Sequence, residues 1–66
     1  MLILGKNIKF FRKQESMTQE QLANLLKLDR TTVAGYESGK HEPALPILVA
    51  IADIFDVTLD ELLGRD

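Results

Sequence analysis

The chain contains no cysteine, and this absence limits how so short a sequence can be stabilised. A domain of 66 residues buries only about 60% of its unfolded surface, so small domains often need a disulfide, a metal or a partner. Disulfides and cysteine-rich zinc sites are excluded here. The single histidine, His41, is expected to be an exposed loop residue rather than a metal ligand. The sequence is therefore expected to depend on helix packing and on oligomerisation.

Apolar side chains recur at helical spacing along most of the chain, and strand-like alternation is absent. Leu4, Ile8 and Phe11 lie at i, i+4 and i+7, which predicts a first helix of about three turns that ends near Ser16. A later apolar run, Leu45–Phe55, predicts another helix. Its one proline stands in the first turn, where a missing N–H group breaks no helical hydrogen bond.

Two threonines carry a signal for the start of a helix. Thr18 is followed three residues later by Gln21, and Thr58 is followed at the same spacing by Glu61. This is the spacing of a capping box, in which the two side chains satisfy free backbone N–H groups. It predicts a helix of about eight or nine residues after Thr18 and a short last helix that ends at residues 63–64.

A further helix is expected from Arg30 to Ser38. Asp29 can cap its start, and Gly39 stands where a left-handed terminator is wanted. Its outer face carries threonine, alanine and glycine, so it is small and uncharged although two of these types are poor helix formers. Such a face suits close approach to another surface. Together these helices predict a compact all-α domain of five helices over residues 1–66.

The charges are unevenly distributed along the chain. Residues 1–40 carry seven basic and four acidic side chains, a net charge of +3, whereas residues 41–66 carry one basic and six acidic side chains, a net charge of −5. This asymmetry favours a basic working face and an acidic far side. The alternative is ordinary solvated surface charge.

Several classes of protein find no support in the sequence. No apolar run approaches the roughly 20 residues that span a bilayer, and residues 1–4 lack the context of a signal peptide. A cytoplasmic protein without a membrane partner is therefore expected. Phosphate-binding loops, metal-binding histidine pairs and hydrolase motifs are absent, so no catalytic residue, metal or cofactor is expected. The carboxylates Asp53, Asp56, Asp60 and Glu61 lack calcium-loop spacing and are interpreted as caps and solvated surface.

The helix after Thr18 and the helix from Arg30 are separated by only about three residues. So short a turn favours a sharp angle between the helices, which is the helix-turn-helix pattern, here over about residues 19–38. A DNA major groove is about 12 Å wide and accepts one helix. The Arg30–Ser38 helix is then expected to enter the groove, while the preceding helix crosses the phosphate backbone.

The run Thr18–Ala23 continues through Leu28–Val33 and Tyr36–Lys40 to Pro43, and the tail Leu48–Leu63 follows. This pattern resembles the lambda-repressor-like, Cro-type (Xre) helix-turn-helix family over about residues 4–63. The resemblance implies a five-helix lambda-repressor-like domain of a sequence-specific transcriptional regulator. It further implies a cytoplasmic, nucleoid-associated repressor that binds a palindromic double-stranded DNA operator as a homodimer.

The resemblance also implies roles for particular side chains. The side chains implied to face base edges are Arg30, Thr31, Ala34 and Gly35. The side chains implied to contact DNA phosphates are Gln19, Thr32, Ser38 and Lys40. Arg12 and Glu37 are implied to form an ion pair that orients the recognition helix rather than touching DNA.

The chain departs from the family pattern at four positions. Ser16, Lys27 and Asp56 stand where the family often has glycine, in turns that commonly require positive φ. Gly35 removes a side chain from the outer face of the recognition helix. Direct base reading is therefore expected to be sparse, with Arg30 carrying more of it.

A homodimer is expected because the Leu45–Phe55 helix is apolar on two faces. One stripe, Leu45, Leu48, Ile51, Ala52 and Phe55, is expected to cover the other helices, which leaves a second stripe without cover. The residues assigned to the dimer interface are Ile47, Ala50, Ile54, Leu59, Leu62 and Leu63. Phe10 and residues 1–3 could extend this patch. The alternative is that Ile47 and Ile54 lie under the terminal helix.

Two other functions are weighed against a DNA-binding repressor. One is a protein-interaction module, such as an antitoxin or a repressor controlled by an antagonist or toxin protein. It would be indicated by a stable stoichiometric partner. The other is a small enzyme, which the chain supports least because a 66-residue bundle offers no obvious cleft. A gel shift with genomic fragments would distinguish an enzyme from a DNA-binding protein.

Overall fold

The helices begin and end close to where the sequence signals place them. The computed structural model describes residues 2–65 and contains α1 (Leu2–Gln14), α2 (Gln19–Leu26), α3 (Arg30–Ser38), α4 (Leu45–Phe55) and α5 (Leu59–Leu63). No strand occurs within this range, so the all-α fold class is confirmed. Within it, no helix is both long and apolar enough to cross a membrane.

Both predicted capping boxes are present. Thr18 Oγ1 accepts a hydrogen bond from the Gln21 N–H group at 3.0 Å, and the Thr18 N–H group donates to Gln21 Oε1 at 2.8 Å. Thr58 and Glu61 exchange the same bonds at 3.0 and 2.9 Å. Asp29 occupies the N-cap position of α3, but its side chain makes no capping hydrogen bond. Asp29 is therefore the N-cap residue, as predicted, but the expected cap by its side chain is wrong.

Three turns use a left-handed backbone conformation without glycine. Ser16, Lys27 and Asp56 have φ values of 55°, 59° and 55°, at the positions where the resemblance suggests glycine. This conformation costs a non-glycine residue about 1 kcal/mol. At Lys27 the turn is held by the Leu28 N–H group, which donates to the Ala23 carbonyl at 2.8 Å. The short connection between α2 and α3 is thereby kept.

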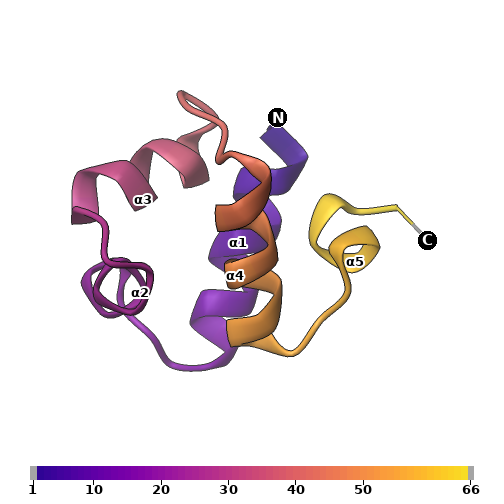
Figure 1. Ribbon diagram of the computed structural model, residues 1–66, viewed down its shortest axis with the longest axis horizontal. Helices are drawn as coiled ribbons and strands as arrows, with labels where there is room; N and C mark the ends of the chain where they lie inside the picture. The colour runs from indigo at the N-terminus through magenta and orange to yellow at the C-terminus, as the bar shows by residue number, and fades with distance from the viewer. Residues whose placement is uncertain (1, 66) are drawn as a thin grey trace.

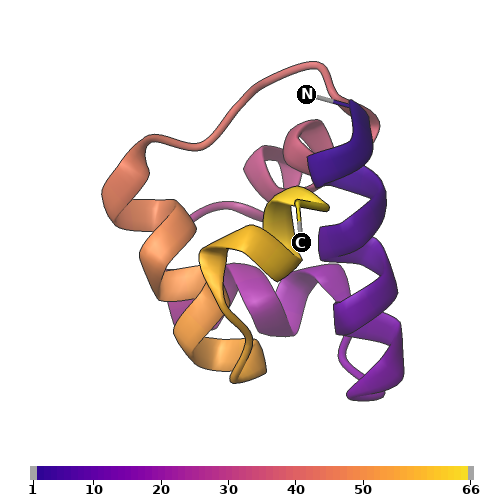
Figure 2. The ribbon, with the colours of Figure 1, turned by 90° about the vertical axis from the view of Figure 1, so that its right-hand side faces the viewer.

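The helices divide the molecule into two ends. In Figure 1, α2 and α3 lie on one side of α1 and α5 lies on the other. Figure 2 shows that α5 sits between α1 and α4. A hydrogen bond of 3.0 Å from the Asn7 amide to the Leu62 carbonyl ties α5 to α1. The α2–α3 end is thus left free of the terminal helix.

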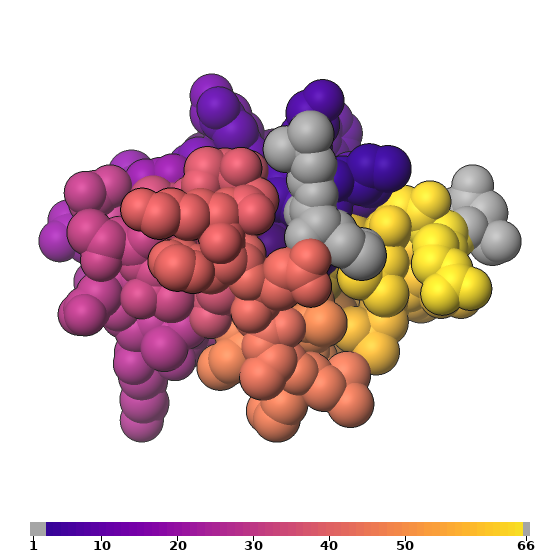
Figure 3. Space-filling view, turned by 90° about the horizontal axis from the view of Figure 1, so that it is seen from above, coloured from indigo at the N-terminus to yellow at the C-terminus, as the bar shows by residue number. Residues whose placement is uncertain are grey.

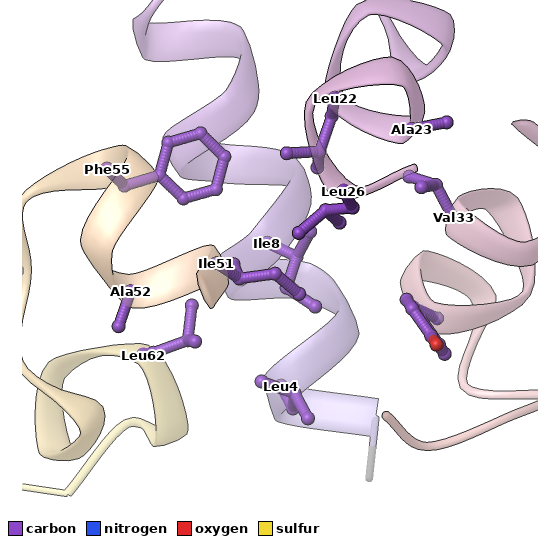
Figure 4. Packing of buried hydrophobic residues seen from close by; sticks show 11 residues of the cluster. Leu4, Ile8, Leu22, Ala23, Leu26, Val33, Ile51, Ala52, Phe55 and Leu62 are labelled. Atoms are coloured by element: carbon purple, nitrogen blue, oxygen red, sulfur yellow. The ribbon is translucent and has the colours of Figure 1, made fainter. Parts of the chain in front are cut away.

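One hydrophobic core joins all five helices (Figure 4). Its fully buried large side chains are Ile8, Leu22, Val33, Ile51 and Leu62. Leu62 was expected at a dimer interface, and this expectation is wrong because the short α5 turns that side chain into the core, where it is 0% exposed.

Gly5 allows α1 and α3 to approach each other closely. A Cβ atom at this position would lie 2.5 Å from the backbone carbonyl oxygens of both Tyr36 and Glu37. Any larger residue would therefore push the helices apart. This contact brings the C-terminal end of α3 against the start of α1.

Arg12 on α1 and Glu37 on α3 form a bidentate ion pair inside the protein. Arg12 Nε lies 2.6 Å from Glu37 Oε2, Arg12 Nη2 lies 3.0 Å from Glu37 Oε1, and the two side chains are 9% and 4% exposed. Arg12 Nη1 also donates to the Met17 carbonyl at 2.8 Å. The hydrogen bond with Glu37 is the main cause that raises the pKa of Arg12, and burial opposes it only in part. The pair thus fixes α3 and the α1–α2 turn to α1.

Loss of either partner should destabilise the fold strongly. Arg12→Met leaves the Glu37 carboxylate buried without a counterion, and Glu37→Gln leaves the Arg12 guanidinium in the same position. Each change should lower the free energy of unfolding by about 3 kcal/mol, as measured by urea titration followed by circular dichroism.

The double variant is the informative control. Because both charges are then gone, it should lose clearly less stability than the sum of the two single losses. Strictly additive losses would mean that the two side chains do not interact.

Candidate nucleic-acid interface

The outer face of α3 and the loop after it form one shallow depression. It is lined by Thr31, Thr32, Ala34, Gly35, Ser38, Lys40 and His41. These residues supply hydroxyl groups, a methyl group, an amine and an imidazole. Hydroxyl and methyl groups suit base edges in a major groove, and an amine suits phosphate. The structure therefore gathers six of the eight residues assigned to DNA contacts on one surface.

The other two assigned residues, Gln19 and Arg30, lie at a second depression. The start of α2 and the turn before it line this depression together with Arg30 and Arg12. The N-terminus of a helix offers free N–H groups and a positive dipole end, which favour a phosphate oxygen. The placement of Gln19 suits a backbone contact beside the recognition helix.

Gln19 connects the buried ion pair to the surface. Its Nε2 donates to Glu37 Oε1 at 3.1 Å, and its Oε1 accepts from Arg30 Nη1 at 3.2 Å. A continuous polar chain thus runs from Arg12 through Glu37 and Gln19 to the exposed Arg30. Sequence reasoning missed both Gln19 contacts, since residues 11 and 18 positions apart carry no local spacing signal.

The surroundings of Gly35 differ from the expectation of an open position on the outer face of α3. It is buried, and a Cβ atom placed there would lie 2.6 Å from Cδ2 of His41. The expectation of an open glycine on the outer face is therefore wrong, because the His41 ring covers it. His41 itself is exposed, in agreement with the sequence analysis. In Figure 3 the loop that follows α3 lies against α3 on this face.

Exposed charges of both signs lie at the α2–α3 end of the molecule. Arg30 and Lys40 are exposed on α3 and the loop after it. The same end also exposes carboxylates, those of Glu20, Asp29 and Glu42. The expected basic face therefore also carries acidic side chains. Asp60 on α5 lies away from the α3 face, since α5 is on the other side of α1 from α2 and α3 (Figure 1). Within residues 2–65, no three histidine or carboxylate side chains gather where they could hold a metal ion.

The residues assigned to the dimer interface are less exposed than expected. Those that remain after Leu62 are only half-buried and pack against the core: Ile47, Ala50, Ile54, Leu59 and Leu63. Leu45, which was expected to cover the other helices, is instead 63% exposed. Val49, which was not singled out, is also exposed at 41%.

Two exposed side chains of α1 add to the apolar surface. Ile3 is 60% exposed and Phe10 is 59% exposed. Ile3 lies beside α5, because a Cβ atom at Gly64 would be 2.9 Å from Ile3 Cγ2. Met1, which was also expected to extend the patch, lies outside the described residues, as does the side chain of Leu2.

Comparison with known proteins agrees with this geometry. The model of a helix-turn-helix family matches residues 8–62. The HTH-type transcriptional regulator AnsR of Bacillus subtilis is 47% identical over 55 residues, which cover 83% of this chain and 47% of that protein. The cryptic phage CTXphi transcriptional repressor RstR of Vibrio cholerae is 41% identical over 54 residues, 82% of this chain and 48% of that protein. The chain thus spans about half the length of these two regulators.

A solved structure supports the same assignment. The restriction-modification controller protein C.AhdI from Aeromonas hydrophila superposes with a TM-score of 0.84 and 31% identity, and the match covers 92% of each chain. The five helices, the α2–α3 motif and these sequence matches lead to one conclusion. The chain belongs to the lambda-repressor-like, Cro-type helix-turn-helix family of DNA-binding transcriptional regulators.

Proposed function

We propose that this chain is the DNA-reading domain of a cytoplasmic repressor that acts at the nucleoid and occupies a palindromic operator as a homodimer. The observation that carries the proposal is the single surface formed by α3 and the loop after it, which gathers small polar side chains beside Lys40. The similarity to RstR, a protein described as a transcriptional repressor, supports repression as the mode of action.

The proposed docking follows from the two depressions. Helix α3 enters the major groove, where Thr31 and Ala34 meet base edges and Arg30 reads a purine. Gln19 at the start of α2 and Lys40 after α3 hold phosphates on the two sides of the groove. The buried Arg12–Glu37 pair keeps α3 in position without touching DNA.

Selection from a random pool of DNA duplexes tests this function directly. The chain should enrich one sequence, and Arg30→Ala should weaken binding to it by about 1–3 kcal/mol and relax the choice at one base pair, because a guanine contact is lost. Lys40→Ala should weaken binding to all DNA sequences alike, and the salt dependence of the affinity should fall by about one released counterion. Fluorescence anisotropy at several salt concentrations measures both effects.

The Arg30 assignment has a clear failure. If Arg30→Ala leaves both the preferred sequence and the affinity unchanged, then Arg30 does not read a base. Enrichment of no sequence by the unaltered chain would contradict the proposed function as a whole.

The homodimer is proposed from size and from the apolar residues of α4 and α5. One copy measures 29 × 23 × 20 Å, whereas successive half-sites on one face of DNA are about 34 Å apart. A palindromic operator therefore needs two copies. We propose that the half-buried Ile47, Ile54 and Leu63 form the contact between them.

Ile54→Lys should weaken the dimer, because a charge would then be buried in an apolar contact. Sedimentation equilibrium at micromolar concentration should give a dimer for the unaltered chain and a monomer for this variant. Asp53→Asn is the matched control, since it changes the net charge by the same amount and removes no apolar surface. A strictly monomeric chain that also binds DNA as a monomer would contradict the proposal.

Control by a partner protein stays a second prediction. An antagonist or toxin protein that copurifies in a fixed ratio with this chain and releases it from its operator would support that reading. Such a partner would add to the DNA-binding function rather than replace it.

A further inference from the structure

The side chain that covers the middle of the recognition helix comes from the loop after it. A Cβ atom at Gly35 would lie 2.6 Å from Cδ2, 3.5 Å from Cγ and 3.6 Å from Nε2 of His41. The imidazole therefore occupies the space that a side chain at position 35 would need. It remains exposed, and it lines the same depression as Thr31 and Ala34.

Hydrogen bonds hold the loop in this position. The His41 N–H group donates to the Gly35 carbonyl at 3.1 Å, and Ser38 Oγ donates to the same carbonyl at 3.2 Å. The Lys40 N–H group donates to Ser38 Oγ at 3.4 Å. The loop is thus fastened to the last turns of α3, and the ring lies against Gly35 on the surface that is proposed to meet DNA.

We propose that His41 is a specificity-determining residue, whose imidazole takes the place of a side chain at position 35 and reads a base edge in the major groove. The inference rests on the proposed entry of α3 into that groove. A neutral imidazole carries one donor and one acceptor, and base edges in the major groove present both kinds of partner. A base contact is proposed because the ring lies against Gly35, a position assigned to base edges, and lines the same depression as Thr31 and Ala34.

The proposal explains why α3 contains a glycine in its interior. Glycine there costs the helix about 0.5–1 kcal/mol relative to alanine. Gly35 has no left-handed backbone that would require it, because the positive-φ glycines among the described residues are Gly39 and Gly64. What Gly35 provides is room for the His41 ring. The pair acts as one unit, with the glycine positioning the histidine.

The test compares base preferences of variants on the duplex that the unaltered chain selects. His41→Ala should lose about fivefold to tenfold in preference at one base pair of each half-site, as expected for a lost base contact. Gly35→Ala should lose preference at the same base pair, because the new methyl group displaces the ring. When Gly35→Ala is added to His41→Ala, the preference at that base pair should change no further, because no ring is left to displace.

Two controls separate base reading from other roles. The melting temperature should hardly change in His41→Ala, because the side chain is exposed. Lys40→Ala should weaken all sequences equally and leave the preferred bases unchanged. The Lys40 pattern therefore shows what a phosphate contact alone would look like.

The outcomes are distinguishable. The inference is overturned if His41→Ala keeps every base preference, or if it weakens all duplexes equally. It is also overturned if Gly35→Ala alters the preference as much in the His41→Ala background as alone, since the methyl group would then act on DNA directly. A chain that selects no duplex at all would instead overturn the proposed function on which the inference rests.

Discussion

The buried pair of Arg12 and Glu37 is the interaction on which the rest of the structure depends. It ties α3 to α1, and through the Met17 carbonyl and Gln19 it also ties down the turn before α2 and the start of that helix. A desolvated ion pair contributes little net stability, but it strongly penalises any arrangement that separates the charges. The main effect of the pair is therefore to fix the orientation of α2 and α3 toward a ligand rather than to add net stability.

The α3 helix is built for contact rather than for its own stability. Its threonines and glycine are poor helix formers, and its N-cap side chain makes no hydrogen bond. The helix persists because Val33 and Tyr36 are anchored in the core and because Gly5 lets α1 pack directly against its C-terminal end. Tertiary contacts on the inner face thus leave the outer face free to be small and polar.

Local signals in the sequence predicted the helices well. The capping boxes at Thr18 and Thr58 are both found where expected. The left-handed turns at Ser16, Lys27 and Asp56 follow from the family resemblance rather than from a local signal. Contacts between distant residues were harder to predict from residue types alone. The sharing of Gln19 between Glu37 and Arg30 and the burial of Leu62 both depend on how the helices are oriented. No local periodicity encodes that orientation.

The central claim is that α3 and the loop after it are the DNA-binding face. Amide chemical shifts of the ¹⁵N-labelled chain, followed by NMR during titration with its selected duplex, test this claim most directly. The account predicts that the largest shifts fall on residues 30–41 and on the start of α2, while most of α5 changes little. Largest shifts along α4 and α5, with residues 30–41 unmoved, would contradict it.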